Sequence, residues 1–127
     1  MKRLGLLNGP INARIGTLGH GHLVMITDCG MPLPDSPAVV DLALVKGTPG
    51  FAEVLRAVLA DLQVEGSTIA SEASGTGVED VVRAEGLFPE AVSHEALKAM
   101  LVEARLIIRT GEATPYANVA LRCGVTF

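Results

Sequence analysis

The sequence predicts an α/β fold: a single compact three-layer domain over residues 1–127, with a mostly parallel or mixed sheet flanked by helices. Two observations lead to this prediction. The unbroken apolar run at residues 23–27 and the mainly apolar segments 39–45 and 106–108 are typical of strands buried on both faces. These runs alternate along the chain with segments in which apolar residues recur at helical spacing. A length of 127 residues is enough for one domain.

In the first half of the chain, Ile11, Ile15 and Leu18 have helical spacing, and Gly19 is the predicted left-handed C-cap. A buried strand over 23–27 follows, and a stiff loop with three prolines leads to a second buried strand over 39–45. Thr48 is the predicted N-cap of the next helix, with Pro49 at its first position. That helix carries one apolar stripe over residues 51–62.

In the second half, the sequence predicts a strand over 64–70, a surface loop over 74–77 and a short helix over 78–85 that ends at Gly86. Ser93 is the predicted N-cap of a further helix, whose apolar stripe continues to Ala104. A third buried strand covers 106–108. Apolar and other residues alternate strictly over 117–125, which indicates a final strand.

Composition excludes several classes of protein. Hydrophobic residues make up 49% of the chain, aromatic residues 3% and charged residues 19%, with a mean hydropathy of +0.42. The chain is too apolar to be disordered, and we expect other subunits to cover part of its surface. With a net charge of −4 and no basic block, we expect no nucleic-acid partner.

Cellular location and membrane association follow from similar observations. Cys29 and Cys123 are far apart and outside any CxxC motif, which is typical of reduced cytosolic thiols. The apolar run 4–7 is interrupted too early for a signal peptide, and no run approaches the roughly 18 residues of a membrane span. We therefore expect a cytoplasmic protein without membrane contact.

Polar residues are few, so the candidates for chemistry are conspicuous. His20 lies between two glycines directly before a buried strand, and Asp28 follows the same strand, where ligand sites of open α/β sheets collect. His94 begins a predicted helix. Tyr116 and Asn118 are two residues apart in the predicted final strand, so we expect their side chains on one face.

Each candidate also has a purely structural interpretation. His20 could be an ordinary loop residue, Asp28 could cap the following turn, and His94 could be a solvated surface residue. Tyr116 could only anchor a strand end, whereas Asn118 is unusual in a strand. These alternatives stay open on the residues alone.

Other chemistries have weaker support. His20 and His22 with Asp28 or His94 could ligate a metal, but an HxH pair alone is a weak signal and we expect no metal or other cofactor. The carboxylate of Asp28 disfavours a thiolate at Cys29, and no nucleophile-elbow or phosphate-loop motif is present. Two histidines, a carboxylate, a phenol and a carboxamide instead suit the hydroxyls of a small sugar.

Several motifs carry a resemblance to a known family. They are Leu18-Gly19-His20-Gly21, the segments 27–34, 41–44, 47–51 and 93–95, and the C-terminal segments 108–112, 115–118 and 124–127. In this order and across nearly the whole chain, they resemble the ribose pyranase and fucose mutarotase family, with Pro-Tyr-Ala-Asn similar to its ribose branch.

The resemblance implies a function and the residues that perform it. It implies an isomerase that interconverts the pyranose and furanose forms of D-ribose without a cofactor, in ribose catabolism. His20 corresponds to the catalytic proton donor, and the sugar-binding positions correspond to Asp28, His94, Tyr116, Ala117 and Asn118. The resemblance further implies a homodecamer of stacked pentamers whose sites are completed by neighbouring subunits.

Two features depart from the family, and two other functions are compatible with the residues. His22 stands where the family commonly has Asp, and the segment 71–91 is shorter and aligns poorly. The alternatives are a mutarotase of another monosaccharide such as fucose, and a monosaccharide-binding protein without catalysis.

Overall fold

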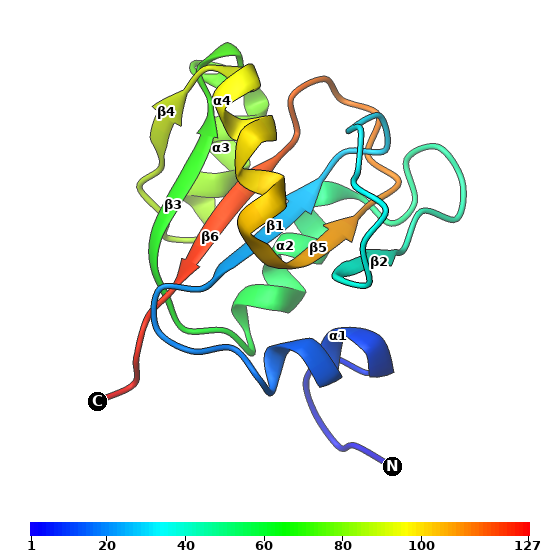
Figure 1. Cartoon of the computed structure of the whole chain (residues 1–127). Helices are drawn as coiled ribbons and strands as arrows, with labels where there is room; N and C mark the ends of the chain where they lie inside the picture. The colour runs from blue at the N-terminus through cyan, green and yellow to red at the C-terminus, as the bar shows by residue number, and fades with distance from the viewer.

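The computed structural model describes all of residues 1–127 and contains one six-stranded mixed sheet with helices on both faces (Figure 1). The strands lie in the order β2-β5-β1-β6-β3-β4. Their bounds are β1 Leu23–Thr27, β2 Val39–Asp41, β3 Val64–Ala70, β4 Glu90–Val92, β5 Ala104–Arg109 and β6 Val119–Cys123. The helices are α1 Gly9–Ile15, α2 Phe51–Leu59, α3 Gly77–Ala84 and α4 His94–Ala99, with 3₁₀ turns at Ser71–Ala73 and Met100–Glu103.

The sheet is parallel at both edges and antiparallel in the middle. β5 pairs in parallel with both β2 and β1, and β3 pairs in parallel with β4. β6 runs antiparallel between β1 and β3. This arrangement confirms the predicted α/β class with a mixed sheet.

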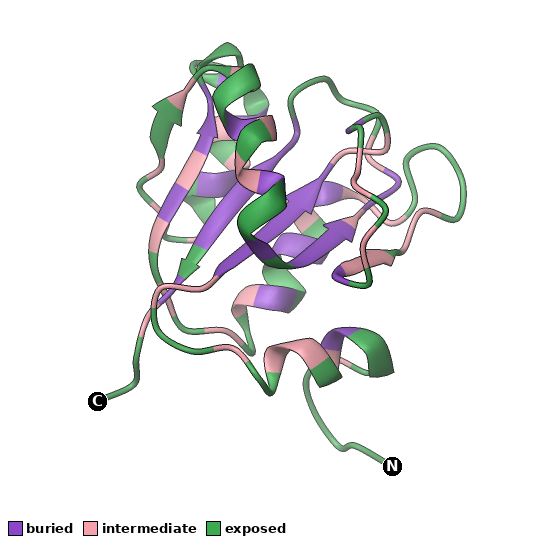
Figure 2. Cartoon of the chain, viewed as in Figure 1, coloured by how far each residue is buried: buried purple, intermediate pink, exposed green.

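Two apolar clusters on opposite faces of the sheet make three layers. The larger cluster joins Ile11 of α1, the stripe of α2 and the apolar side of α3 to one face of the central strands. The smaller cluster packs Leu97 and Leu101, from α4 and the turn after it, on the other face. All five residues of β1 are buried, as predicted for a central strand, and Figure 2 shows the buried strands in the middle of the molecule.

Several predicted element ends are wrong. α1 ends at Ile15 with Gly16 as its C-cap, so Gly19 is not the cap. β2 covers only Val39–Asp41, because the Asp41 carboxylate accepts the amide of Ala43 and turns the chain outward. Residues 42–45 therefore lie in a loop and not in a buried strand, with Leu42 and Ala43 half-buried and Leu44 and Val45 exposed.

The start of α2 differs for a tertiary reason. The predicted N-cap Thr48 and helical Pro49 both precede the helix, which begins at Phe51 with Gly50 as N-cap. The amide of Gly111 donates to the Pro49 carbonyl at 2.8 Å, so this segment is held against the C-terminal part of the chain instead. The Phe51 amide is capped from outside the helix, by the carboxylate of Glu112.

The remaining predictions are closer. β3 matches the predicted 64–70, and Ser93 caps α4 by accepting the Ala96 amide at 3.1 Å. The predicted strand 106–108 lies within β5, and α3 begins one residue before the predicted 78. The predicted final strand is too long, because β6 covers only Val119–Cys123. The short edge strand β4 is not predicted from the sequence.

Candidate functional site

The structure separates the predicted site residues into two groups at opposite ends of β1. His20 precedes the strand and Asp28 follows it, and the five strand residues alone span roughly 16 Å. In Figure 1 the loop before β1 lies near the C-terminus, whereas the loop after β1 lies beside the segment that leads into β6. Within one chain, His20 is therefore remote from the other predicted residues.

A cavity of about 300 Å³ lies at the Asp28 end of the sheet. Its lining includes three of the predicted residues, namely Asp28, His94 and Tyr116. The remaining lining comes from the loop after β1 and from the segment before β6: Cys29, Gly30, Met31, Glu112, Ala113, Thr114 and Pro115. Its volume is at the lower end of the range for small-molecule sites, about 300–1,000 Å³.

Asp28 is held in place by hydrogen bonds on both sides of its carboxylate. Oδ1 accepts the Gly30 amide at 3.0 Å, and Oδ2 accepts Nδ2 of Asn118 at 2.9 Å. The Oδ1 of Asn118 in turn accepts the Asp28 amide at 2.8 Å. Asn118 is fully buried, so in this structure its side chain orients Asp28. Ala117 is buried beside it.

Tyr116 and Asn118 do not lie on a strand, so the predicted common face is wrong. The Asn118 amide donates to the Tyr116 carbonyl at 2.8 Å, which makes a tight turn before β6 begins. Tyr116 has a φ of +62°, a conformation that costs a non-glycine residue roughly 1–3 kcal/mol and that is enriched at functional sites. This turn directs Tyr116 to the cavity and Asn118 into the core.

His94 contacts Tyr116 at the wall of the cavity. Their rings make an edge-to-face contact with centroids 5.1 Å apart. The backbone amide of His94, at the first position of α4, donates to the Glu72 carboxylate at 3.0 Å. Its ring Nδ1 is buried and has no hydrogen-bond partner within the chain. An unpaired buried nitrogen at a cavity wall is a site where a ligand hydroxyl can bind.

Glu112 fixes the wall of the cavity to α2. Its carboxylate accepts the Phe51 amide at 3.1 Å and the Thr114 hydroxyl at 2.8 Å. The hydrogen bond from the Phe51 amide is the largest cause that lowers the pKa of Glu112, and those from Thr114 add to it against an opposing effect of burial. Glu112 is therefore a charged clamp between two segments far apart in the sequence.

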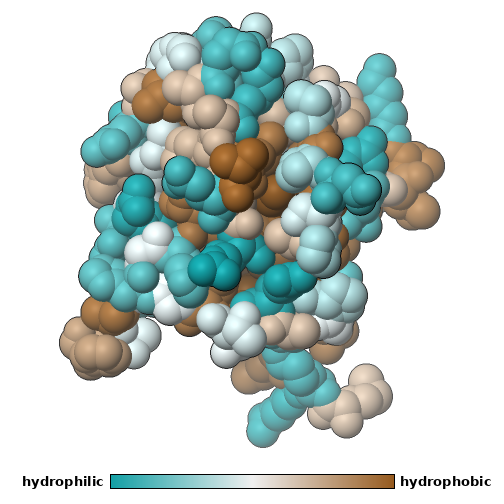
Figure 3. Space-filling view, viewed as in Figure 1, coloured by the Kyte–Doolittle hydropathy of each residue, from teal (hydrophilic) through white to brown (hydrophobic).

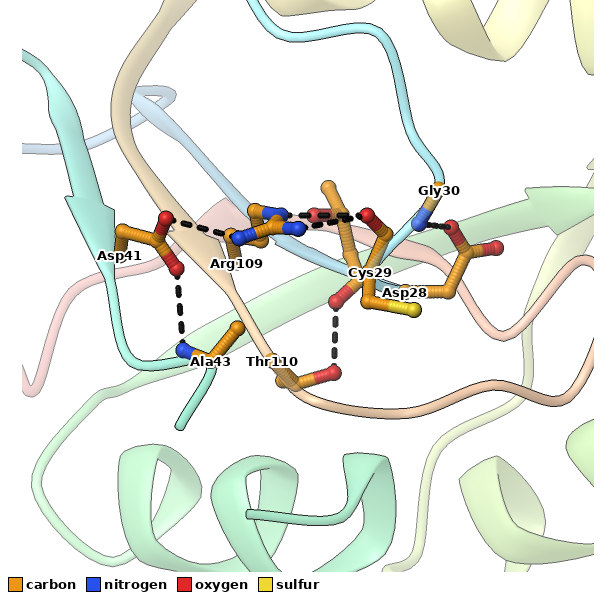
Figure 4. A network of polar contacts seen from close by, with 8 residues as sticks. Asp28, Cys29, Gly30, Asp41, Ala43, Arg109 and Thr110 are labelled. Atoms are coloured by element: carbon orange, nitrogen blue, oxygen red, sulfur yellow. Dashed lines mark hydrogen bonds and ion pairs between the residues drawn. The ribbon is translucent and has the colours of Figure 1, made fainter. Parts of the chain in front are cut away.

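Arg109 holds the loop after β1 in the same way (Figure 4). Its Nε and one terminal nitrogen donate to the Cys29 carbonyl at 3.1 and 3.0 Å, and the other terminal nitrogen contacts the Asp41 carboxylate at 2.8 Å. The hydroxyl of Thr110 donates to the Thr27 carbonyl at 2.7 Å. These bonds fix the backbone on either side of Asp28.

At the other end of β1, His20 is exposed and has one side-chain partner. Its Nε2 lies 2.8 Å from Oε2 of Glu65, at the start of β3. His22 is separately engaged, because its Nδ1 accepts the Gly19 amide at 2.9 Å. No group of three histidine, cysteine, aspartate or glutamate side chains is arranged to hold a metal ion.

Four residues with a role in this arrangement were not predicted from the sequence, namely Glu65, Glu72, Arg109 and Glu112. Arg109 and Glu112 lie inside a motif that carries the family resemblance, which was a usable signal. Glu65 and Glu72 had none, because their roles depend on contacts with residues 45 and 22 positions away.

Comparison with known proteins places the chain in a family. The model of the RbsD / FucU transport protein family matches residues 1–126, and the chain belongs to this family. It is 52% identical over 129 residues to a D-ribose pyranase of Streptomyces coelicolor, and each chain is covered completely. It is 44% identical over 131 residues to a D-ribose pyranase of Geobacillus kaustophilus, covering all of this chain and 96% of the relative.

Solved structures agree with the fold. The structure of Bacillus subtilis RbsD complexed with D-ribose matches with a TM-score of 0.93 and 34% identity, over the whole of both chains. A fucose mutarotase of Streptococcus pneumoniae, solved with L-fucose, matches with a TM-score of 0.83 and 17% identity over the whole of both chains. The second match supports the fold alone. None of the helices combines the length and the hydropathy that a membrane span requires.

Proposed function

We propose that this protein is an isomerase that interconverts the pyranose and furanose forms of D-ribose. The observation that carries the proposal is full-length identity of 52% to a protein named D-ribose pyranase. The match to a structure that contains D-ribose and the small cavity beside Asp28 support it. The product would feed ribose catabolism.

The reaction is proton transfer within one molecule. The pyranose opens when its ring oxygen gains a proton and its anomeric hydroxyl loses one, which gives the open-chain aldehyde. The open chain then rotates about its carbon–carbon bonds, and the neighbouring hydroxyl attacks the aldehyde carbon to close the furanose ring. The bond from the anomeric carbon to one hydroxyl oxygen is exchanged for a bond to another, protons move between oxygens, and no electrons are exchanged with a co-reactant, so the chemistry needs only an acid and a base.

We assign the acid to His20, because imidazole is the side chain that most readily gives and regains a proton near neutral pH. Asp28 accepts sugar hydroxyls or acts as the base. Tyr116 and the unpaired Nδ1 of His94 bind the remaining hydroxyls. Ala117 and Asn118 form the turn behind these groups, where Asn118 holds Asp28 toward the sugar.

His20 and the cavity lie at opposite ends of β1, so this assignment requires a second copy of the chain. We propose that His20 of one subunit completes the cavity of its neighbour in a homodecamer. A contact between two different ends of a molecule is heterologous and can close into a ring. Both ends carry exposed apolar side chains, at Leu44 and Val45 and at Val125 and Phe127, and Figure 3 shows apolar surface at both edges.

We also propose a cytoplasmic location. Cys29 and Cys123 are both free thiols, and Cys123 is buried in the core. Free thiols of this kind are kept reduced in the cytosol.

The proposed function is tested by NMR saturation transfer between the ring forms of D-ribose. We expect the wild-type protein to accelerate the exchange and His20→Ala to lose most of the acceleration, since acid–base groups contribute about 10²–10⁴-fold. Arg56→Ala is the control, because Arg56 is an exposed residue of α2 that lies outside both the turn of His20 and the lining of the cavity. Ribose binding without faster exchange would overturn the isomerase assignment. A larger acceleration for fucose than for ribose would identify fucose as the preferred substrate.

The oligomeric state is tested by sedimentation of the native protein. A decamer is expected, and a stable monomer with full activity would contradict the shared site.

A further inference from the structure

Glu65 holds an unusual place in the sheet. In the pairing of β3 with β6, Val64 lies opposite Cys123 and Gly66 lies opposite Arg122, so Glu65 is an extra residue in a β-bulge. Bulges of this kind redirect a side chain, and they are common beside active sites. Here the bulge places the Glu65 carboxylate 2.8 Å from Nε2 of His20.

The turn that carries His20 is fixed independently of this contact. The His22 amide donates to the Gly19 carbonyl, and the Gly19 amide donates to Nδ1 of His22. Gly21, at the third position of this turn, has a φ of +80°, which glycine adopts without strain. The backbone of His20 is therefore set by its own turn, while the orientation of its ring is left to Glu65.

The partner of Nε2 decides which ring nitrogen is free. An ionised carboxylate only accepts hydrogen bonds, so Nε2 must be the donor and must carry a hydrogen in both the charged and the neutral imidazole. The proton that the ring can give away is then the one on Nδ1. When it leaves, the neutral ring remains as the Nε2–H tautomer, still bonded to Glu65.

We propose that Glu65 is the positioning residue of His20: it holds the Nε2–H form of the ring, so that Nδ1 gives the proton to the ring oxygen of the sugar and later takes one back. This inference rests on the proposed function, because it specifies the atom through which the assigned acid acts. No net proton is consumed, since the proton lost by the anomeric hydroxyl balances the proton gained by the ring oxygen.

The test uses the full-length protein with Glu65→Gln, which keeps the size of the side chain but can donate to Nε2 as well as accept from it. We expect the turnover rate of ribose exchange to fall by at least about tenfold, with the substrate concentration for half-saturation nearly unchanged. Glu90→Gln is the matched control. Glu90 is exposed and lines the same surface hollow as Glu65. Glu90→Gln therefore removes one negative charge, as Glu65→Gln does, but leaves the contact with His20 intact.

Two further measurements separate a positioning role from a structural one. The ¹⁵N chemical shifts of the His20 ring should report the Nε2–H tautomer in the wild type and a mixture of tautomers in Glu65→Gln. In the His20→Ala background, Glu65→Gln should cause no additional loss, because Glu65 acts only through the ring.

The outcomes distinguish this inference from the proposed function. Wild-type turnover in Glu65→Gln, an Nδ1–H tautomer in the wild type, or an equal loss in Glu90→Gln would overturn the role of Glu65. Wild-type turnover in His20→Ala would instead overturn the assignment of the acid, while the ¹⁵N shifts would still report whether Glu65 sets the tautomer.

Discussion

Replacing Asn118 by alanine should destabilise the protein as well as weaken its activity. The side chain is fully buried, accepts the Asp28 amide and donates to the Asp28 carboxylate. A hydrogen bond to a charged group is worth about 1.5–3 kcal/mol, and an amide left unpaired in the interior costs about 1–3 kcal/mol. We therefore expect Asn118→Ala to lower the free energy of unfolding by about 3 kcal/mol.

Urea unfolding at a fixed protein concentration measures this loss, because the stability of an oligomer depends on its concentration. With a slope of about 1–3 kcal/mol per molar urea, the midpoint should fall by at least about 1 M. Asn118→Asp, which has the same shape, should be at least as harmful, since it brings a second carboxylate against Asp28. An unchanged midpoint together with weaker ribose binding would show instead that Asn118 contacts only the sugar and does not stabilise the fold.

Three further predictions concern the segments that shape the cavity. Gly111→Ala should cost at least about 2 kcal/mol of unfolding free energy in urea, because its methyl group would overlap the backbone carbonyl of Thr48, and a wild-type midpoint would contradict this. Glu112→Gln should flatten the acid side of the stability curve. The lowered pKa of Glu112, whose largest cause is the hydrogen bond from the Phe51 amide, stabilises the fold above its ordinary value of 4.5, and this contribution is lost as the pH falls through the lowered value. Thermal unfolding of both proteins from pH 2 to 7 measures this dependence. An unchanged loss of stability at acidic pH in Glu112→Gln would contradict the role of the Glu112 carboxylate in holding the two segments together. Ser93→Ala removes the cap of α4 and should cost about 1 kcal/mol, which circular dichroism in urea can detect.

The central strands could be predicted because they are buried on both faces. A strand such as Leu23–Thr27 must be apolar throughout, and its sequence contains the whole signal. The cap of α4 was equally readable, because Ser93 acts on a residue three positions away. Features that depend on local chemistry were therefore accessible from the sequence.

The errors have two physical origins, which are distant contacts and local turns. Thr48 and Pro49 have the chemistry of a helix start, but the Gly111 amide holds them and Glu112 caps the helix instead. The alternation across 116–118 resembles a strand, yet the turn at Tyr116 ends that pattern before β6 begins. Local propensity is a weak prior: tertiary bonds overrode it at Thr48 and Pro49, and a tight turn overrode it at Tyr116.

The candidate site was predicted as residue types and not as an arrangement. Asp28, His94 and Tyr116 line one cavity, and their role in binding a sugar stays a prediction. The sequence position of His20 predicts that it lies at the opposite end of β1 from Asp28. Its contact with Glu65 could not be predicted in this way. The bulge that brings Glu65 to His20 depends on pairing between strands far apart in the sequence.

We propose that ribose ring exchange occurs at a site built from His20 of one subunit and Asp28 of another. The most direct test mixes His20→Ala and Asp28→Asn chains in equal amounts, unfolds and refolds them together, and measures ribose exchange by saturation transfer. Each variant alone should be nearly inactive. Random assembly places an intact His20 beside an intact Asp28 at about one interface in four, so the mixture should recover about a quarter of the wild-type rate. A mixture that stays as inactive as the separate variants would contradict the shared site.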